Sequence, residues 1–479
     1  MLFNSIEFAI FLPVVFLLYW FVFNKNLKLQ NLFIVVASYV FYGWWDWRFL
    51  FLIAFTSFCS WGSGLLIEKY KDSPRKAKTI SALNIVLNLL ILGVFKYYDF
   101  FAKEFAQLFG LSSDGLLLNI ILPVGISFYT FQALSYSIDV YRGKLAPTHD
   151  VIQFFAFVSF FPQLVAGPIE RATNLLPQFE KARHFDYDTA VDGMRQILWG
   201  LFKKMVVADN CAIYVDQVFN NYQSQSGSTL LLAAVMFSFQ IYGDFSGYSD
   251  IAIGTAKLFG IKLMRNFNMP YFSRDIAEFW RRWHISLTTW FRDYVYIPLG
   301  GSRVSKAKVV RNTFVIFLLS GFWHGANWTF IVWGAYHALL FLPLILLGKN
   351  RKYTDVVAAG RWLPTWKEAG QMLLTFLLAV VGWIIFRASN ITEAWHYLCG
   401  MFDKSLLSVP WLDDRHYYIP VVLSVAVMLV VEWLQRDRDH AFDLSGIKSH
   451  VLKFGIYYVM VALLFWLGGH AESFIYFQF

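Results

Sequence analysis

Residues 314–347 decide the fold, and they read FVIFLLSGFWHGANWTFIVWGAYHALLFLPLILL. Two apolar runs, Phe314 to Leu319 and Phe330 to Leu347, enclose a polar turn that contains His324. Basic loops of a membrane protein stay in the cytoplasm. The stretch therefore predicts a chain that enters the membrane, turns near His324 and returns. Its two basic flanks contain Arg303, Lys306, Lys308, Arg311, Lys349, Arg351 and Lys352.

The composition of the whole chain supports a membrane protein. Of 479 residues, 57% are hydrophobic and only 15% are charged, and the mean hydropathy is +0.48. A soluble domain carries about a quarter charged residues, so lipid is the main solvent of this chain. Further apolar blocks, together with their aromatic flanks, approach the roughly 20 residues of a span. These blocks are Phe8 to Phe23, Phe49 to Ile67, Ile80 to Val94, Leu116 to Ile138, Met372 to Phe386, Val421 to Trp433 and Phe454 to Leu467.

Basic clusters after the first, third and fifth spans predict the orientation. Placing all three in the cytoplasm puts the N-terminus outside. No Lys or Arg precedes the first apolar run, which favours a retained span over a cleaved signal peptide. The net charge of +9 then belongs to the cytoplasmic loops, and we expect lipid rather than nucleic acid around the chain. The clusters contain Lys25, Lys28, Lys69, Lys71, Arg75, Lys76, Lys78, Arg142 and Lys144.

We predict an all-α polytopic membrane protein with about eleven spans. Val151 to Ala166 and Gln196 to Val207 are too short or too charged for full spans. They predict re-entrant or buried helices, because broken backbone at membrane depth must be enclosed by protein or face water. We expect one domain (1–479) with peripheral spans (1–150), a core with re-entrant elements (151–350) and C-terminal spans (351–479).

Several kinds of chemistry are not supported by the sequence. Cys59, Cys211 and Cys399 lie far apart without CxxC or Cys/His spacing, so neither a disulfide nor a metal site is expected. No G-x-S-x-G elbow, Walker A sequence or pair of glycosidase carboxylates is apparent. We expect no bound cofactor.

Ionisable groups are expensive in lipid, so each is a functional candidate. The stretch Phe239 to Asp250 places Tyr242, Asp244 and Asp250 inside an apolar region. A polar helix face satisfied by neighbouring spans and a direct role in the site are both open. The two aspartates could orient a helix or a histidine.

A second polar stretch contains Trp280, Arg281, Arg282 and His284. On a helix Trp280, His284 and Leu287 share one face. Arginines beside tryptophans favour an interfacial helix that snorkels its charges. They also suit an anionic ligand such as a phosphate, which is the second interpretation.

The turn at His324 is the strongest candidate site, with Trp323 and Asn327 beside the histidine. An imidazole titrates near neutral pH and can take the proton of a hydroxyl that attacks an activated carbonyl. We expect His324 to be the general base. His284, Asn327 or a backbone N–H could polarise the carbonyl, and direct transfer and an acyl-enzyme are both open.

These stretches resemble the membrane-bound O-acyltransferase family, in particular its bacterial alginate O-acetyltransferase-like branch. The matching motifs are QIYGDFSGYSD (240–250), FWRRWH (279–284) and GFWHG (321–325), with smaller matches at 122–129, 167–169 and 474–479. The resemblance implies a ring of tilted helices around a thin centre with a funnel on each side. It also implies that His324 is catalytic and that His284 is a second site residue.

The resemblance further implies an inner (plasma) membrane enzyme. Its co-substrate would be a cytoplasmic acyl thioester, either acetyl-CoA or an acyl carrier, and its final acceptor a polysaccharide. A periplasmic or extracellular acetyltransferase partner could dock at Phe474 to Phe479, although packing of the last helix explains that segment equally well. The alternatives are D-alanyl transfer to teichoic acid, lipid or protein acylation, and a transporter built from broken helices.

Overall fold

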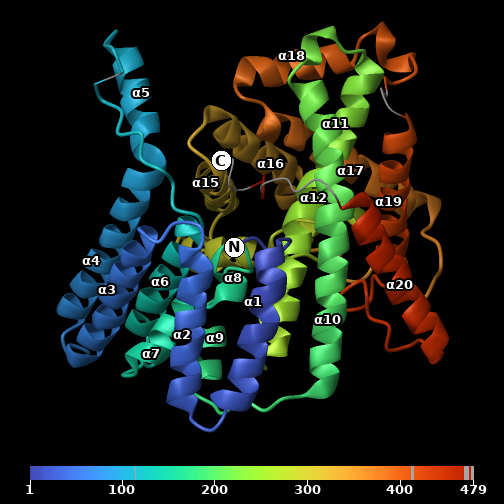
Figure 1. Cartoon of the computed structure of the whole chain (residues 1–479). Coiled ribbons are helices and arrows are strands. Elements are labelled where there is room, and N and C mark those ends of the chain that lie inside the picture. The colour runs from blue at the N-terminus through green and yellow to red at the C-terminus, as the bar shows by residue number, and fades with distance from the viewer. Residues whose placement is uncertain (114, 412–414, 469–473, 476–479) are drawn as a thin grey trace. The chain divides into compact units, whose positions relative to one another are not determined.

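The computed structural model describes the chain apart from residues 114, 412–414, 469–473 and 476–479 (Figure 1). The described residues form helices and connecting segments, and no strand occurs among them. Their packing separates two compact units. Unit 1 contains residues 1–194 and 252–264, and unit 2 contains residues 195–251 and 265–479. The three-part division predicted for a single domain stays a prediction.

Six helical stretches in the described part of the chain are long and apolar enough to cross a membrane. Helices of 10 to 17 residues at 6–22, 27–43 and 418–434 are also apolar. An all-helical, multi-pass membrane protein is therefore confirmed, whereas about eleven spans and a ring arrangement stay predictions. The six stretches are α3 (Phe49–Lys69), α4 to α5 (Pro74–Leu108), α12 (Gly227–Leu258), α16 (Trp328–Leu346), α17 (Trp366–Arg387) and α20 (His450–Leu467).

In unit 1, α3 packs against α4 and α6, and α2 packs against α7. The remaining helices of this unit are α1 (Ile6–Leu17), η1 (Leu18–Val22), α2 (Leu27–Gly43), α4 (Pro74–Leu92), η2 (Gly93–Tyr97), α5 (Tyr98–Leu108), α6 (Ile126–Tyr141), α7 (Val151–Ser159), α8 (Phe161–Leu164), α9 (Ala172–Phe179) and the first half of α10 (Tyr187–Leu201).

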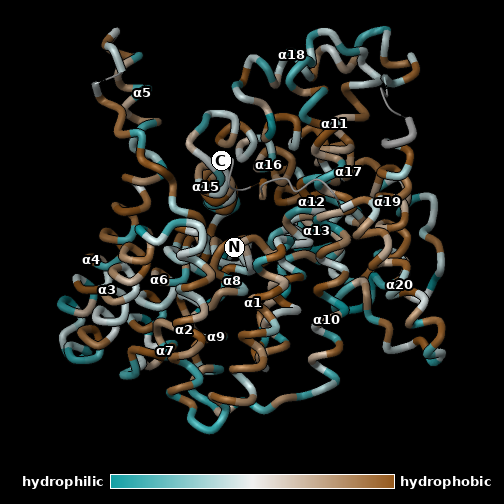
Figure 2. Tube along the Cα trace, in the orientation of Figure 1, coloured by the Kyte–Doolittle hydropathy of each residue, from teal (hydrophilic) through white to brown (hydrophobic). Residues whose placement is uncertain are grey.

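The basic loops of unit 1 gather at one end. Figure 2 shows the loops between α1 and α2 and between α3 and α4 as hydrophilic stretches at the lower ends of their helices. The α6–α7 loop lies beside the second of these, since His149 Nε2 is 2.9 Å from Glu68 Oε2 near the end of α3. All three basic clusters thus lie on one side, which supports the proposed orientation.

Two predictions in unit 1 have different outcomes. The predicted span from Leu116 is wrong in its first half, because α6 begins only at Ile126. The helix is preceded by Pro123 and by Gly125 in the left-handed conformation, with φ at 76°, and neither fits a helix interior. Val151 to Ala166 does not form a full span, as predicted, because α7 ends at Ser159 and a separate short buried helix, α8, follows.

Unit 2 contains the second half of α10 and the helices that follow it, except the last turns of α12 (252–258), which belong to unit 1. The stretch Gln196 to Val207 is not a short separate helix as predicted. It belongs to a continuous helical stretch from Tyr187 to Phe219, with a π-helical segment at its centre. The helices are η3 (Phe202–Ala208), α11 (Asp209–Phe219), η4 (Tyr222–Ser224), α12, η5 (Pro270–Phe272), α13 (Ile276–Arg282), α14 (Ile285–Phe291), η6 (Arg292–Tyr296), α15 (Lys306–His324), α16, α17, α18 (Ile391–Met401), η7 (Lys404–Leu407), α19 (Arg415–Leu434) and α20.

The predicted turn at His324 is confirmed as a helical hairpin of α15 and α16. Two glycines let the helix backbones touch. A Cβ on Gly321 would lie 2.2 Å from the carbonyl oxygen of Phe330, and one on Gly334 would lie 2.4 Å from that of Phe317. No side chain fits at these distances, so the hairpin requires glycine at both positions.

Candidate functional site

His324 is the last residue of α15, and the residue is only 3% exposed. Aromatic rings surround it. The ring centroids of Trp323, Trp333 and Phe386 lie 5.1, 5.1 and 5.3 Å from that of the imidazole. The hairpin therefore places a titratable group in apolar surroundings that limit the access of water.

Asn327 caps the second helix of the hairpin. Its Oδ1 accepts a hydrogen bond from the backbone N–H of Thr329 at 3.0 Å, and its Nδ2 donates to the backbone oxygen of Ser389 at 2.9 Å. Both ends of the amide are engaged in these bonds. We therefore assign Asn327 to capping α16 rather than to polarising a substrate carbonyl.

His284 lies where α13 and α14 are interrupted, with φ at 42° and ψ at 55°. The prediction of one helix face shared by Trp280, His284 and Leu287 is wrong for this reason. The backbone N–H of Asn268 donates to the oxygen of Arg282 at 2.9 Å, and that of Ile285 donates to the oxygen of Asn266 at 2.8 Å. These bonds to a neighbouring segment replace helical ones and hold His284 in the left-handed region.

The imidazole of His284 is hydrogen-bonded to the side-chain amide of Asn266, a residue that the sequence did not single out. Its Nδ1 lies 3.0 Å from Asn266 Oδ1. Both residues are buried, and among the described residues His284 Nε2 has no hydrogen-bond partner. His284 lies outside the six candidate spans, and burial lowers its pKa to about 3. The ring is therefore neutral at physiological pH.

A single indole contacts both predicted catalytic residues. The ring of Trp323 lies 5.9 Å from that of His284 and 5.1 Å from that of His324. Phe245 of α12 packs edge-on against His284 at 4.6 Å. The structure thus brings His284, His324 and Trp323 together in one place, which we call the histidine pocket.

A third buried histidine lies next to this pocket. His337 of α16 accepts a hydrogen bond at Nδ1 from Trp280 Nε1 at 3.4 Å. The ring of Trp333 lies 5.0 Å from His337 and 5.1 Å from His324. Sequence reasoning missed His337 because it interrupts an apolar run without polar neighbours, although an ionisable residue in a span was itself a signal.

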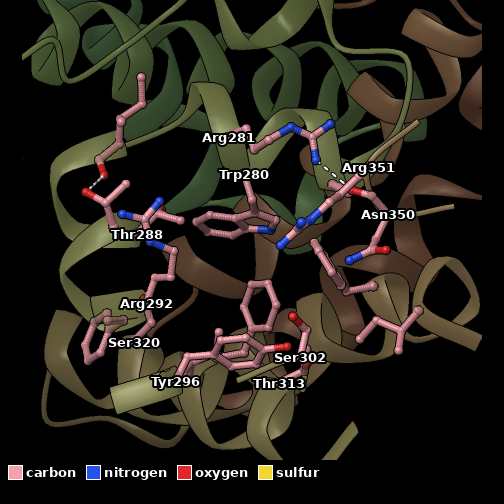
Figure 3. A pocket seen from close by; sticks show the side chains of 18 of the residues that line it. Trp280, Arg281, Thr288, Arg292, Tyr296, Ser302, Thr313, Ser320, Asn350 and Arg351 are labelled. Carbon is pink, nitrogen blue, oxygen red and sulfur yellow. Dashed lines mark hydrogen bonds between the residues drawn. The ribbon is translucent and has the colours of Figure 1, made fainter. Parts of the chain in front are cut away.

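A cavity of about 580 Å³ opens among α13 to α16 and the loop that follows (Figure 3). Figure 3 shows Trp280, Arg292, Tyr296 and Arg351 around the same space. Its described lining includes three arginines (Arg281, Arg292, Arg351) and no carboxylate. Neither His284 nor His324 lines it, but Ser320 does, one helical turn before His324.

Trp280 connects the cavity to the histidine pocket. Its indole lines the cavity and lies 5.5 Å from the ring of Trp333, which in turn contacts His324. Arg281, on the same helix, fixes the cavity wall. Its Nη1 donates to the backbone oxygen of Asn350 at 2.7 Å, and its Nη2 to that of Tyr353 at 2.6 Å.

Comparison with known proteins decides the family. The sequence profile of the MBOAT, membrane-bound O-acyltransferase family matches residues 144–369. A Pseudomonas aeruginosa protein named "Probable alginate O-acetylase AlgI" is 43% identical over 408 residues, which cover 84% of this chain and 75% of that protein. The chain belongs to the membrane-bound O-acyltransferase family. It is therefore an acyltransferase, as the sequence motifs predicted.

Two other relatives of this acyltransferase have different printed functions. The "Peptidoglycan O-acetyltransferase" of Helicobacter pylori is 33% identical, and the match covers 100% of this chain and 98% of that protein. The "Teichoic acid D-alanyltransferase" of Bacillus subtilis is 30% identical over 283 residues, or 56% of this chain and 69% of that protein.

Arg282 of the acyltransferase is not an interfacial residue. It is buried, and its Nη2 lies 2.8 Å from Glu278 Oε1. Glu278 also pairs with Arg274, whose Nε lies 3.0 Å from Oε2. The predicted snorkelling is wrong here, because a buried carboxylate supplies the partner that water would otherwise supply.

The predicted carboxylates of α12 pair with lysines that precede α11. Lys204 Nζ lies 2.7 Å from Asp209 and 2.8 Å from Asp244, and Lys203 Nζ lies 2.6 Å from Asp250. We call these five residues the ion-paired cluster. In these contacts Asp244 and Asp250 hold helices together, which is the more cautious of the two predicted roles.

Two neighbours extend the ion-paired cluster. Tyr242 donates a hydrogen bond to Glu432 Oε1 at 2.7 Å, and Gln196 Nε2 donates to Asp250 at 2.8 Å. In the described part of the chain, no group of three His, Cys, Asp or Glu residues is arranged to hold a metal ion.

The chain end also reaches this cluster. Phe474 and Ile475 are buried, and the backbone N–H of Ile475 donates to Asp244 Oδ2 at 2.6 Å. The ring of Phe474 lies 4.8 Å from that of Tyr248. These two residues pack on α12, while residues 476–479 of the predicted docking segment lie outside the described residues.

Proposed function

We propose that this chain moves an acetyl group from a cytoplasmic thioester to a hydroxyl group on the outer side of the inner membrane. The final acceptor is an exopolysaccharide or a cell-wall polysaccharide. The observation that carries the proposal is the pair of buried imidazoles, His284 and His324, around one indole in a member of an O-acyltransferase family. The names of the relatives, for alginate and for peptidoglycan, support a sugar acceptor.

His324 acts as general base in this mechanism. It takes the proton of the acceptor hydroxyl as the oxygen attacks the thioester carbonyl. The tetrahedral intermediate then expels the thiolate, which receives that proton from His324, so the products are an ester and a free thiol. Aromatic rings on several sides of His324 keep water from competing with the hydroxyl.

The geometry separates the groups that could assist. Asn327 is engaged in capping, and His284 presents Nε2 rather than its bonded Nδ1. A neutral imidazole that donates through Nδ1 has a lone pair on Nε2. We therefore propose that His284 Nε2 accepts a hydrogen bond from a hydroxyl of the acceptor substrate. A backbone N–H then remains as the group that donates a hydrogen bond to the developing oxyanion.

The donor enters through the cavity lined by Trp280. The described lining of this cavity contains three arginines and no carboxylate, which suits an anionic donor, since guanidinium groups bind phosphate oxygens well. Arg292 pairs with Asp293 outside the lining, and Arg281 donates to two backbone oxygens. Among the described residues Arg351 has no hydrogen-bond or ion-pair partner. Arg351→Gln should therefore raise the donor KM about tenfold, the cost of one charge-assisted hydrogen bond. An unchanged KM for both acetyl-CoA and an acyl carrier would contradict the proposal that the acyl donor binds in this cavity.

The deciding experiment measures ester-linked acetate on surface polysaccharide. Cells that lack the native protein receive wild type, His324→Ala, His284→Ala or the control His149→Ala, which changes an exposed loop residue. Membrane levels are matched. Acetate with wild type and the control but not with His324→Ala supports the mechanism. Full acetate with His324→Ala rejects the assigned base.

The same cells test the alternatives. D-alanyl transfer has support from the Bacillus subtilis relative, so D-alanyl ester is measured in parallel, and its appearance instead of acetate would replace the acetyl assignment. Loss of all ester with retained solute flux would favour a transporter. A chain that ends at Ile475 tests the proposed partner docking, and unchanged acetylation by that chain would reject it.

A further inference from the structure

Asn266 lies in the non-helical segment between α12 and η5, outside every sequence motif of the candidate site. Its side chain is fully buried. Its Oδ1 lies 3.0 Å from His284 Nδ1, and its Nδ2 donates to Ser249 Oγ of α12 at 2.9 Å.

We propose that Asn266 is a positioning residue that keeps the proton of His284 on Nδ1 and so turns the lone pair of Nε2 toward the acceptor. This inference rests on the proposed function for its consequence in catalysis. Its structural part, the choice of tautomer, stands on the contacts of Asn266 alone.

The contacts identify which amide atom faces the imidazole. The backbone N–H of Ser286 lies 3.4 Å from the same amide atom, and the Ser286 hydroxyl lies 2.9 Å from it. A backbone N–H can only donate, so this atom is the oxygen. An amide oxygen only accepts, and His284 Nδ1 therefore carries the hydrogen.

Asn266 also fixes the backbone on which His284 stands. Its carbonyl oxygen accepts the N–H of Ile285 at 2.8 Å, directly after the left-handed residue. One residue thus holds both the side chain and the backbone of His284. This double attachment keeps the imidazole in place although position 284 adopts a backbone conformation that few residues other than glycine adopt.

Within the described part of the chain, the contacts of the His284 ring involve no charged side chain. The groups packed on His284 are the rings of Phe245, Phe267 and Trp323 and the uncharged side chains of Asn266 and Ser286. Burial is the cause of its low pKa, without a contribution from a charged residue. The tautomer in this pocket is therefore set by hydrogen bonding.

The tautomer determines what Nε2 can do. Without a hydrogen-bond partner at Nδ1, a neutral imidazole carries its proton mainly on Nε2. The Nε2 atom of His284 would then donate a hydrogen bond instead of accepting one. An enzyme histidine held in the wrong tautomer loses up to about 10⁴ in rate. Asn266→Leu should accordingly lower ester formation at least about 100-fold, mainly in kcat, while His284 is still present.

The first test needs no activity. The full-length protein, labelled with ¹⁵N-histidine and placed in lipid nanodiscs, is compared by NMR with its His284→Asn variant to assign the signals of His284. We expect the Nδ1–H form in wild type and the Nε2–H form in Asn266→Leu. Asn268→Ala is the matched control, because it removes an amide from the same segment that, among the described residues, makes no hydrogen bond to His284. Unchanged tautomer in Asn266→Leu overturns the inference.

The second test uses the conservative variant. Asn266→Asp retains an acceptor for Nδ1–H but adds a negative charge, which raises the pKa of His284. Ester formation from acetyl-CoA on alginate oligosaccharides should be largely retained at high pH, with its acid limb moved to higher pH. A profile identical to that of wild type would contradict the inference. If wild type forms no ester, the proposed function fails, and the NMR result alone decides the role of Asn266.

Discussion

In the ion-paired cluster, Lys204 lies within 2.8 Å of two carboxylates, whereas in the histidine pocket the imidazole of His324 is surrounded by three aromatic rings. Both regions are buried in unit 2. In the cluster each lysine has a carboxylate within ion-pair distance. In the pocket a neutral imidazole, His284, has a nitrogen without a partner among the described residues.

This difference separates two uses of polar groups at membrane depth. A charge buried without a partner is strongly destabilising, so the lysines and aspartates pair with one another and hold helices together. Their charged groups are therefore not left for catalysis. A neutral imidazole costs less to bury and keeps a lone pair for chemistry. The highest density of charge is therefore a poor guide to the reacting groups in this chain.

The largest effect is expected when the ion-paired cluster is broken. Lys204→Met leaves Asp209 and Asp244 without their shared cation and should lower the free energy of unfolding by about 3–5 kcal/mol. We expect little folded protein by size-exclusion chromatography. Asp209→Asn and Asp244→Asn, added together to Lys204→Met, should restore part of the yield. A wild-type melting temperature for Lys204→Met alone would refute the structural role.

The histidine pocket should respond in the opposite way. His324→Gln should lower acyl transfer by about 10²–10⁴-fold, the usual contribution of a general base. The melting temperature should hardly change, because Gln has a similar size and no charge is stranded. Transfer rate per folded molecule is the measurement. A variant that unfolds like Lys204→Met would show that the two regions do not differ in the way described.

The hairpin that carries His324 should show an intermediate effect. Gly321→Ala forces α15 and α16 apart at the Phe330 carbonyl and should cost about 1–3 kcal/mol, with reduced transfer. Gly62→Ala is the matched control, since its Cβ would meet no atom within 4 Å. Thermal unfolding and transfer are measured for both. Equal behaviour of the two variants would mean that close helix contact is unimportant.

The smallest effect is expected at Asn327. Loss of the helix cap in Asn327→Ala should cost about 1 kcal/mol of stability. Transfer per folded molecule should be unchanged, and Asn327→Asp should recover only part of the stability, because it retains the cap on Thr329 but loses the bond to Ser389. A fall in kcat without a matching loss of stability would show that Asn327 takes part in the reaction.

The sequence predicted those parts of the fold and site that depend on local pattern. Apolar blocks predicted helices long enough to span, and a polar turn between two such blocks with basic flanks predicted the hairpin that turns at His324. Gly125 and Pro123 also lie in the sequence, but the apolar pattern around them concealed the late start of α6. Local pattern was therefore sufficient where a polar turn marked the boundary and insufficient where it did not.

The rest depends on contacts between distant residues. His284 was expected on a helix, and only the bonds between 266–268 and 282–285 reveal the interruption. Asn266 is one amide in a segment without periodicity, and nothing local distinguishes it from Asn268. Lys203 and Lys204 fall in the stretch that is too charged for a full span, but their partners Asp250 and Asp244 on α12 lie 47 and 40 residues further along the chain. No local sequence pattern predicts which residues pair at that separation.

The left-handed backbone of His284 has a consequence for directed evolution. A residue with a side chain costs about 1–2 kcal/mol in this conformation, and glycine costs much less. The backbone cost that glycine would relieve at position 284 is opposed by the cavity left in place of the buried imidazole, so a library selected for heat resistance alone does not test the proposed acceptor of the substrate's hydrogen bond. Laboratory improvement of this chain should select for ester formation from the first round.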